Sequence, residues 1–243
     1  MSLAGRGVVV TRPSALAAGL AARIEAAGGR AIRFPAIKIE DLPRPAALKR
    51  TASYDLAIFI SPTAVDKAVG DGRRWPRVAA VGAGTRQALE ARGVSPVIAP
   101  QGEADSEALL ALPELRQVAG QRVLIVRGEG GRALLGETLT KRGARVEYAE
   151  CYRRTRPRAD PTPLLSSWAG GAVHAVTVNS GEALENFAAL LGEAGAARLR
   201  STPLFVPHAR ITAQAERLGV RQTVVAGPTD EEMLRRLVAY FSS

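Results

Sequence analysis

The sequence predicts an α/β protein built from two doubly wound domains with parallel sheets. Short apolar runs alternate with helical patterns of ten or more residues, which is typical of parallel βαβ units. The apolar runs contain no polar alternation, so their strands are expected to be buried on both faces. The chain has 243 residues, which fits two domains of roughly 120 residues each.

The same order of elements occurs twice along the chain. The corresponding blocks are 5–35 with 120–150, 54–69 with 173–188, 77–94 with 203–220, and 97–113 with 223–239. In this correspondence Arg12 matches Arg127, and Ser61 matches Ser180. Four corresponding blocks in one order indicate two copies of a single βα-rich unit. Taken alone, the repeats suggest a domain boundary near residue 117.

Each expected element is marked in the sequence. The strands are expected at the apolar runs 8–11, 56–60, 78–82, 123–126, 175–178 and 204–207. Helices are expected to begin after a residue whose side chain accepts a hydrogen bond from a free backbone N–H group. The candidates are Ser61, Ser106, Ser180 and Thr229. The arrangement resembles flavodoxin-like domains, in which ligands bind at the carboxyl ends of the strands.

Composition excludes several classes of protein. The single cysteine, Cys151, permits neither a disulfide framework nor a cysteine-based metal site. No nucleotide-binding glycine motif and no cluster of His and Cys ligands occurs, so neither a cofactor nor a metal is expected. The N-terminus lacks a signal-peptide pattern, and no run is apolar enough to cross a bilayer. A soluble, cytoplasmic protein without membrane contact is expected.

The net charge of +10 suggests an acidic partner. Most of the positive charge comes from arginines spread along the chain, which is also what nucleotide composition alone can produce. A nucleic-acid partner is not expected, because there is no basic tail, no aromatic-interleaved basic strand and no helix-turn-helix. An anionic surface and a polyanionic small molecule stay open as partners.

Two serine corners favour an anionic ligand. Ser61 and Ser180 each follow an apolar strand and precede a helix, where backbone N–H groups and the positive end of the helix dipole point together. Such a corner can bind a carboxylate without a lysine. The alternative is that both serines only cap their helices, which contributes about 1 kcal/mol each.

Motifs across nearly the whole chain resemble the uroporphyrinogen-III synthase family. They read VVVTRP, IFISPTAV, VAAVGAGT, ADSEALL, VLIVRGEGGRALL, AECYRR, VTVNSGEAL, HARITAQAERLGV and VVAGPTDEEML. The resemblance implies two α/β domains joined by a two-stranded linker, with the active site in a cleft between them. One domain would contain 1–35 and 157–243, the other 38–150, with linkers at about 35–40 and 149–157. The first strand and helix of each repeat would then lie in the other repeat's domain.

The resemblance also implies a reaction. Hydroxymethylbilane, a linear tetrapyrrole with eight carboxylates, would lose its hydroxyl as water and close through a spiro-pyrrolenine, so that ring D is inverted. This is a hydro-lyase reaction that needs no cofactor and depends mainly on positioning. A monomer is expected. The alternative is a two-domain protein that binds an anionic metabolite without catalysis.

Tyr152 is the candidate catalytic residue, because it matches the family's linker tyrosine. A phenol can donate a hydrogen bond to the departing hydroxyl. The alternative is an aromatic side chain that packs the hinge.

Other positions are candidate substrate contacts. Arg12 and Arg127 could each hold a carboxylate, or could instead form ion pairs with the protein itself. The remaining candidates are Ser61, Thr63, Gly82, Thr85, Ser180, Gly181 and Arg210. Asn179 stands where the family more often has Ser or Thr, and His208 is more typical of a packed or capping residue than of a catalyst.

Overall fold

The computed structural model describes residues 2–70, 74–101 and 105–242. Within it the chain forms two compact units. Unit 1 contains Met1–Lys38 and Thr155–Ser243, and unit 2 contains Ile39–Arg154. The boundary near residue 117 that the repeats suggest is wrong. It lies inside unit 2, because the strands on either side of it, at 56–59 and 122–128, are hydrogen-bonded neighbours in one sheet.

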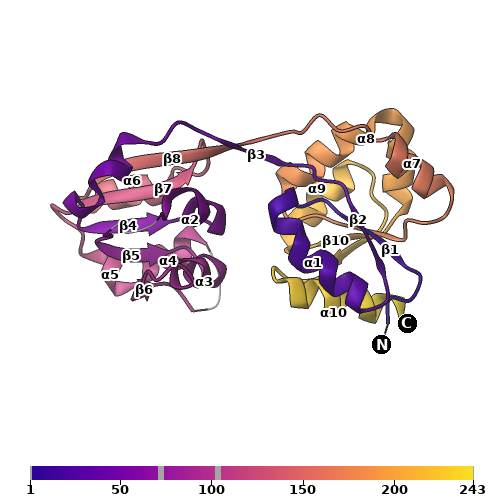
Figure 1. Ribbon diagram of the computed structural model, residues 1–243, viewed down its shortest axis with the longest axis horizontal. Coiled ribbons are helices and arrows are strands. Elements are labelled where there is room, and N and C mark those ends of the chain that lie inside the picture. The colour runs from indigo at the N-terminus through magenta and orange to yellow at the C-terminus, as the bar shows by residue number, and fades with distance from the viewer. Residues whose placement is uncertain (1, 71–73, 102–104, 243) are drawn as a thin grey trace. The chain divides into compact units, whose positions relative to one another are not determined.

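Unit 1 is a parallel sheet with helices on both faces (Figure 1). The strand order is β11-β10-β9-β1-β2, and the recorded pairs are all parallel. Its strands are β1 (Gly7–Val10), β2 (Arg30–Arg33), β9 (Ala175–Thr177), β10 (Leu204–Val206) and β11 (Thr223–Val225). Its helices are α1 (Ser14–Ala26), α7 (Thr162–Ala169), α8 (Gly181–Ser201), η2 (Ala209–Ile211), α9 (Thr212–Arg217) and α10 (Asp230–Phe241). Leu20 of α1 and Leu237 of α10 pack in one cluster with Phe205 of β10, so these two helices cover the same face.

Unit 2 has the same architecture, with the strand order β3-β8-β7-β4-β5-β6. Its strands are β3 (Lys38–Asp41), β4 (Leu56–Phe59), β5 (Arg77–Ala80), β6 (Val97–Ile98), β7 (Arg122–Gly128) and β8 (Arg145–Thr155). Its helices are η1 (Ala46–Ser53), α2 (Pro62–Ala68), α3 (Ala83–Glu90), α4 (Ser106–Ala111), α5 (Pro113–Arg116) and α6 (Leu134–Lys141). The predicted fold class, α/β with parallel sheets in two units, is confirmed.

The apolar strands are buried on both faces, as predicted. In β4, Phe59 packs with Val65 of α2 and Leu89 of α3, whereas Ile58 packs with Leu109 of α4 and Leu139 of α6. Successive side chains of a strand point to opposite faces. An uninterrupted apolar run is therefore what a sheet covered by helices on both sides requires.

The chain passes between the units within two neighbouring strands. One passage is in β3, between Lys38 and Ile39, and the other is at the end of β8, between Arg154 and Thr155. The two strands are hydrogen-bonded neighbours at one edge of the unit 2 sheet. The backbone N–H of Leu42 continues this contact by donating to the Cys151 carbonyl at 3.1 Å.

Helix starts follow the capping pattern with one correction. Ser61 and Ser180 accept hydrogen bonds from the N–H groups of Ala64 and Ala183, and Thr229 forms a capping box with Glu232. At α4 the cap is Asp105, not Ser106 as the sequence suggested, because the Asp105 carboxylate accepts from Ala108 N–H at 2.8 Å. Ser106 is the first helical residue.

A polar group joins η1 and β8 near the amino ends of the unit 2 strands. The Tyr54 hydroxyl donates to one oxygen of Glu147 at 2.6 Å, and Arg50 donates to the other at 2.6 Å. The hydrogen bond from Tyr54, supported by Arg50, holds the pKa of Glu147 below its usual value of 4.5. The same carboxylate and burial raise the pKa of Tyr54, burial having the larger effect.

A carboxylate with a depressed pKa stabilises the fold above its unfolded pKa, and that stability is lost as pH falls through the folded pKa. We therefore expect Glu147→Gln to lower the thermal unfolding temperature at pH 7. The difference from wild type should shrink as pH falls below about 4.5. Thermal unfolding between neutral and acidic pH measures this, with Glu25→Gln, an exposed carboxylate on α1, as the control. A difference that stays constant across the pH range would contradict the assignment.

Candidate functional site

Ser61 and Tyr152 meet at the carboxyl edge of the unit 2 sheet. Ser61 follows β4 and caps α2, where its Oγ accepts from Ala64 N–H at 3.0 Å. Tyr152 lies on β8, and its hydroxyl oxygen is 3.0 Å from Ser61 Oγ. The two residues are 91 positions apart in the chain. The fold thus brings together a candidate catalytic residue and a candidate binding residue.

Gly128 gives the Tyr152 ring its place. Strand β7 lies between β8 and β4, so the phenol has to pass the end of β7 to reach Ser61. A side-chain carbon added to Gly128 would lie 2.7 Å from two carbons of the Tyr152 ring, closer than real contacts of this kind. The register of β7 and β8 shifts between Arg127 and Gly128, and Glu129 N–H donates to the Tyr152 carbonyl at 2.7 Å.

Sequence reasoning did not single out Gly128. The available signal was a glycine at the end of an apolar strand, which often marks a bulge or a close approach of another group. The ring that Gly128 admits is nearly enclosed, because Tyr152 is only 2% exposed. The phenol is therefore held in a fixed position rather than projecting freely into solvent.

The neighbouring corner contains Gly82 and Thr85. Gly82 is extended and caps α3 after β5, and Thr85 N–H donates to its carbonyl at 3.1 Å. Thr85 is 4% exposed. Thr63 is half-buried in the first turn of α2. Because β4 and β5 are adjacent parallel strands, both corners lie at the same sheet edge as the Ser61–Tyr152 contact.

Arg127 has partners within unit 2. Its guanidinium donates to the carbonyls of Gly128 and Gly130, lies 3.3 Å from Glu150, and stacks on the Tyr148 ring at 4.7 Å from the centroid. The structure contains the alternative that the sequence left open for Arg127, an ion pair within the protein. A role in holding substrate stays a prediction.

The corresponding position in unit 1 is Arg12, after β1. Its guanidinium pairs with Asp230, the first residue of α10, while its Nε is buried without a hydrogen-bond partner. Gly19 faces the same carboxylate, since an added side-chain carbon would lie 2.7 Å from Asp230 Oδ2. Both arginines of the duplicated pair are thus anchored by acidic residues.

The unit 1 corner contains Ser180 and Gly181. Ser180 caps α8 by accepting from Ala183 N–H at 3.1 Å. Gly181 packs directly against Gln214 of α9, so there is no room for a side chain at Gly181. The Gln214 amide donates to the Gly181 carbonyl at 3.3 Å. Asn179 Oδ1 is buried without a hydrogen-bond partner. Arg210 and His208 are exposed beside this corner, at the end of β10.

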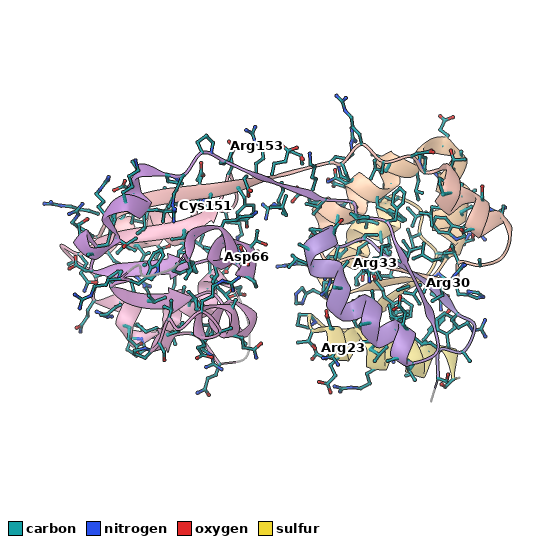
Figure 2. The ribbon with its side chains drawn as sticks, in the orientation of Figure 1. Arg23, Arg30, Arg33, Asp66, Cys151 and Arg153 are labelled. Atoms are coloured by element: carbon teal, nitrogen blue, oxygen red, sulfur yellow. The ribbon has the colours of Figure 1, made fainter. Side chains whose placement is uncertain are left out.

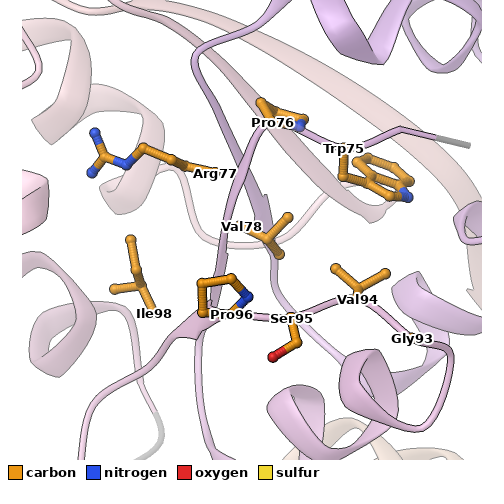
Figure 3. A pocket seen from close by; sticks show the side chains of 9 residues that line it. All are labelled: Trp75, Pro76, Arg77, Val78, Gly93, Val94, Ser95, Pro96 and Ile98. Carbon is orange, nitrogen blue, oxygen red and sulfur yellow. The ribbon is translucent and has the colours of Figure 1, made fainter.

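Two hollows lie outside these corners. One, with a volume of about 510 Å³, is lined by Trp75 and Pro76 before β5, by Arg77 at its start, and by Ser95 and Pro96 before β6 (Figure 3). These loops are at the amino edge of the sheet, opposite the capped corners. The other, of about 360 Å³, is bordered by η1, α2 and β8, and includes Asp66 and Cys151 (Figure 2).

His174 and Cys151 have contacts within the fold. His174 Nδ1 accepts from Gly7 N–H at 3.0 Å, and burial, aided by Arg6 and Arg30, lowers its pKa. Burial raises the pKa of the Cys151 thiol to about 11. Within residues 2–70, 74–101 and 105–242, no group of acidic, His or Cys side chains could hold a metal ion. In the same residues, no helix combines the length and apolarity needed to traverse a bilayer.

Comparison with known proteins gives consistent matches. The family model described as uroporphyrinogen-III synthase HemD matches residues 18–235. Uroporphyrinogen-III synthase of Escherichia coli K12 is 36% identical over 241 residues, covering 94% of this chain and 98% of the relative. The Salmonella typhimurium protein of that name is 37% identical, with the same coverage.

Solved structures show the same fold. A uroporphyrinogen III synthase variant from the bacterium Thermus thermophilus matches with a TM-score of 0.58 at 19% identity, covering 98% of this chain and 99% of that one. Uroporphyrinogen-III synthetase from Helicobacter pylori matches with a TM-score of 0.63 at 13% identity, covering 97% and 99%. At these identities the likeness concerns the fold alone.

The close packing at Gly128 gives a testable prediction. Gly128→Ala should push the Tyr152 ring away from Ser61, because the ring is enclosed and the added carbon has no space. We expect a loss of roughly 1–3 kcal/mol in unfolding free energy, measured by denaturant titration. Gly170→Ala is the control, since its added carbon would meet only ordinary contacts of 3.5 Å or more. Equal stability of the two variants would contradict this packing.

Proposed function

The chain belongs to the uroporphyrinogen-III synthase family, and we propose on this basis how its own residues close hydroxymethylbilane to the ring-D-inverted macrocycle. The family match covers residues 18–235 of the chain. The resemblance drawn from the sequence motifs is therefore confirmed, as is the assignment to a lyase of tetrapyrrole biosynthesis. The observation that carries the proposed chemistry is the part-buried Ser61–Tyr152 contact.

Tyr152 is proposed as the general acid. The carbon–oxygen bond of the hydroxymethyl group breaks, its electron pair leaves with oxygen, and the pyrrole nitrogen supplies electrons to the resulting cation. The phenol proton passes to the departing hydroxyl, which leaves as water. Ring D attacks this cation through its substituted carbon, which has no hydrogen, and the spiro-pyrrolenine forms. The bond between that carbon and the methylene of ring C then breaks, and the methylene bonds to the other α carbon of ring D. The phenolate regains a proton when this last carbon loses its hydrogen. General acid help of this kind typically contributes roughly 10²–10⁴-fold.

The remaining selectivity is a matter of conformation. The product forms only if ring D attacks through its substituted carbon, so the flexible chain has to be held in one arrangement. Holding reacting groups in position is itself a large catalytic effect. The enclosed Tyr152 ring, at 2% exposure, is suited to this because it offers its proton from one fixed place.

Substrate carboxylates are proposed to bind at the capped corners of both units. The proposed contacts are Ser61, Thr63, Gly82, Thr85 and Arg127 in unit 2, and Arg12, Ser180, Gly181 and Arg210 in unit 1. Helix N-termini with free N–H groups favour anions. The net charge of +10 favours the approach of a substrate with many carboxylates. Arg210 is the best placed for direct contact, because it is exposed at a carboxyl-edge corner.

The location and assembly of the chain are also proposed. We propose a cytoplasmic monomer whose partner is this small molecule rather than a nucleic acid. The alternative considered from the sequence was a two-domain protein that binds an anionic metabolite without catalysis. Incubation with hydroxymethylbilane and analysis of the product isomers separates the two. Accelerated formation of the type III isomer supports the enzyme, whereas binding with only uncatalysed type I product supports the alternative.

Removing the phenol hydroxyl tests the general acid. Tyr152→Phe should lower kcat by about 100-fold, since the ring stays but the proton is lost. The thermal unfolding temperature should change little, because only one hydrogen bond to Ser61 disappears. The rate of type III isomer formation at saturating hydroxymethylbilane measures the effect on kcat. Wild-type rates of type III formation in this variant would rule out Tyr152 as the acid.

Removing an exposed guanidinium tests the corner in unit 1. Arg210→Ala should raise KM by about threefold with little change in kcat, because a partly solvated ion pair to a carboxylate contributes modestly. Arg221→Ala is the matched control, since Arg221 is also exposed but precedes β11 at the opposite sheet edge. Equal KM values for the two variants would contradict a substrate contact at Arg210.

A further inference from the structure

We propose that Ser61 is a positioning residue for Tyr152, and that its hydroxyl donates the hydrogen bond that leaves the phenol proton free for substrate. The proposal rests on the proposed function of Tyr152 and gives Ser61 a role other than binding a carboxylate. It starts from one contact, the 3.0 Å separation of Ser61 Oγ and Tyr152 Oη.

The hydrogen-bonding capacity of Ser61 permits this direction, and the proposed role of Tyr152 selects it. A serine hydroxyl has one proton and two lone pairs. One lone pair already accepts Ala64 N–H at 3.0 Å. The hydroxyl proton is then available for the phenol oxygen. In the opposite direction, Tyr152 would donate its single hydroxyl proton to Ser61 and have none to donate to the departing hydroxyl.

The chain of donors also directs a hydrogen bond to the phenol oxygen, where negative charge develops as the proton leaves. Ala64 N–H, at the first turn of α2, donates to Ser61, and Ser61 donates to Tyr152. Successive hydrogen bonds polarise one another in a poorly solvated site. As the phenol proton moves to the departing hydroxyl, the phenolate oxygen keeps the Ser61 hydrogen bond, which becomes stronger because its acceptor is charged.

The duplication contains an internal comparison. Ser180 caps α8 with a contact of 3.1 Å, almost the same as that of Ser61. In the part of the chain that the structure describes, Ser180 Oγ has no hydrogen bond besides the one from Ala183 N–H. Capping therefore does not require a phenol. The contact with Tyr152 is an addition that one corner has and its counterpart lacks.

The surroundings of Tyr152 make Ser61 the group that fixes the phenol oxygen. The Tyr152 ring packs over Gly128, and the Tyr152 backbone carbonyl accepts a hydrogen bond from Glu129 N–H. Ring and backbone are thus held by packing, while the hydroxyl oxygen has one recorded hydrogen-bond partner among the described residues, Ser61. Loss of that partner should change the orientation of the phenol hydroxyl rather than the location of the ring.

The experiment is a double-mutant cycle on kcat. Ser61→Ala should lower kcat by about 10-fold, since a hydrogen bond to a charged group is lost in the transition state. Ser61→Thr keeps the hydroxyl and should restore most of the rate. In the Tyr152→Phe background, Ser61→Ala should have little further effect, because the group through which it acts is already gone.

The matched control is Ser180→Ala, which removes the corresponding cap. Its effect on kcat or KM should be the same with Tyr152 and with Phe at that position, because Ser180 does not contact the phenol. The thermal unfolding temperatures of Ser61→Ala and Ser180→Ala show how much stability each variant loses with its helix cap. Ser61→Ala with a wild-type kcat, or with effects additive to Tyr152→Phe, would overturn the proposal.

A spectroscopic readout separates this proposal from the proposed function. The chain has four tyrosines, so NMR with tyrosine labelled at Cζ can follow Tyr152 in the free protein. Ser61→Ala should shift the Tyr152 signal, and Ser180→Ala should leave it in place. An unchanged Tyr152 signal in Ser61→Ala contradicts the hydrogen bond. A wild-type protein that forms no type III isomer contradicts the proposed function instead.

Discussion

Parallel strand pairing is the constraint on which both units depend. When neighbouring strands run in the same direction, every strand ends at the same edge of the sheet, and each following helix begins there. The free N–H groups of those helices gather at that edge together with the side chains that cap them. Ser61, Gly82 and Ser180 occupy their positions for this reason. The anion-favouring corners are a consequence of topology, and specific side chains then modify them.

The sequence predicts this topology well because the physics behind it is local. Uninterrupted apolar runs, capping residues and the repeated order of blocks lead to the strands, the helix starts and the α/β class. The single shifted cap, from Ser106 to Asp105, reflects two adjacent residues that can both accept a backbone hydrogen bond. The division into units is different. It depends on strands that pair across the repeats, as β4 does with β7, and no local pattern reports this.

The candidate site shows where sequence reasoning ends. The resemblance pointed to Tyr152, and the corner pattern pointed to Ser61, but nothing in either segment places them 3.0 Å apart. Their meeting depends on the order of β8, β7 and β4 and on a glycine in the middle strand. For Arg12 and Arg127 the sequence leaves open both a substrate contact and an ion pair within the protein. Their acidic partners, Asp230 on a distant helix and Glu150 on the adjacent strand, are visible only in the folded chain.

The buried thiol beside Tyr152 has a practical consequence. With a pKa of about 11, Cys151 carries the reactive thiolate in only about one molecule in 10⁴ at neutral pH. Alkylating reagents and mild oxidants should therefore react very slowly with the single cysteine while the chain is folded. The same thiol becomes an ordinary reactive group when β8 is exposed, so its rate of labelling by a maleimide reports opening of the strand that carries Tyr152.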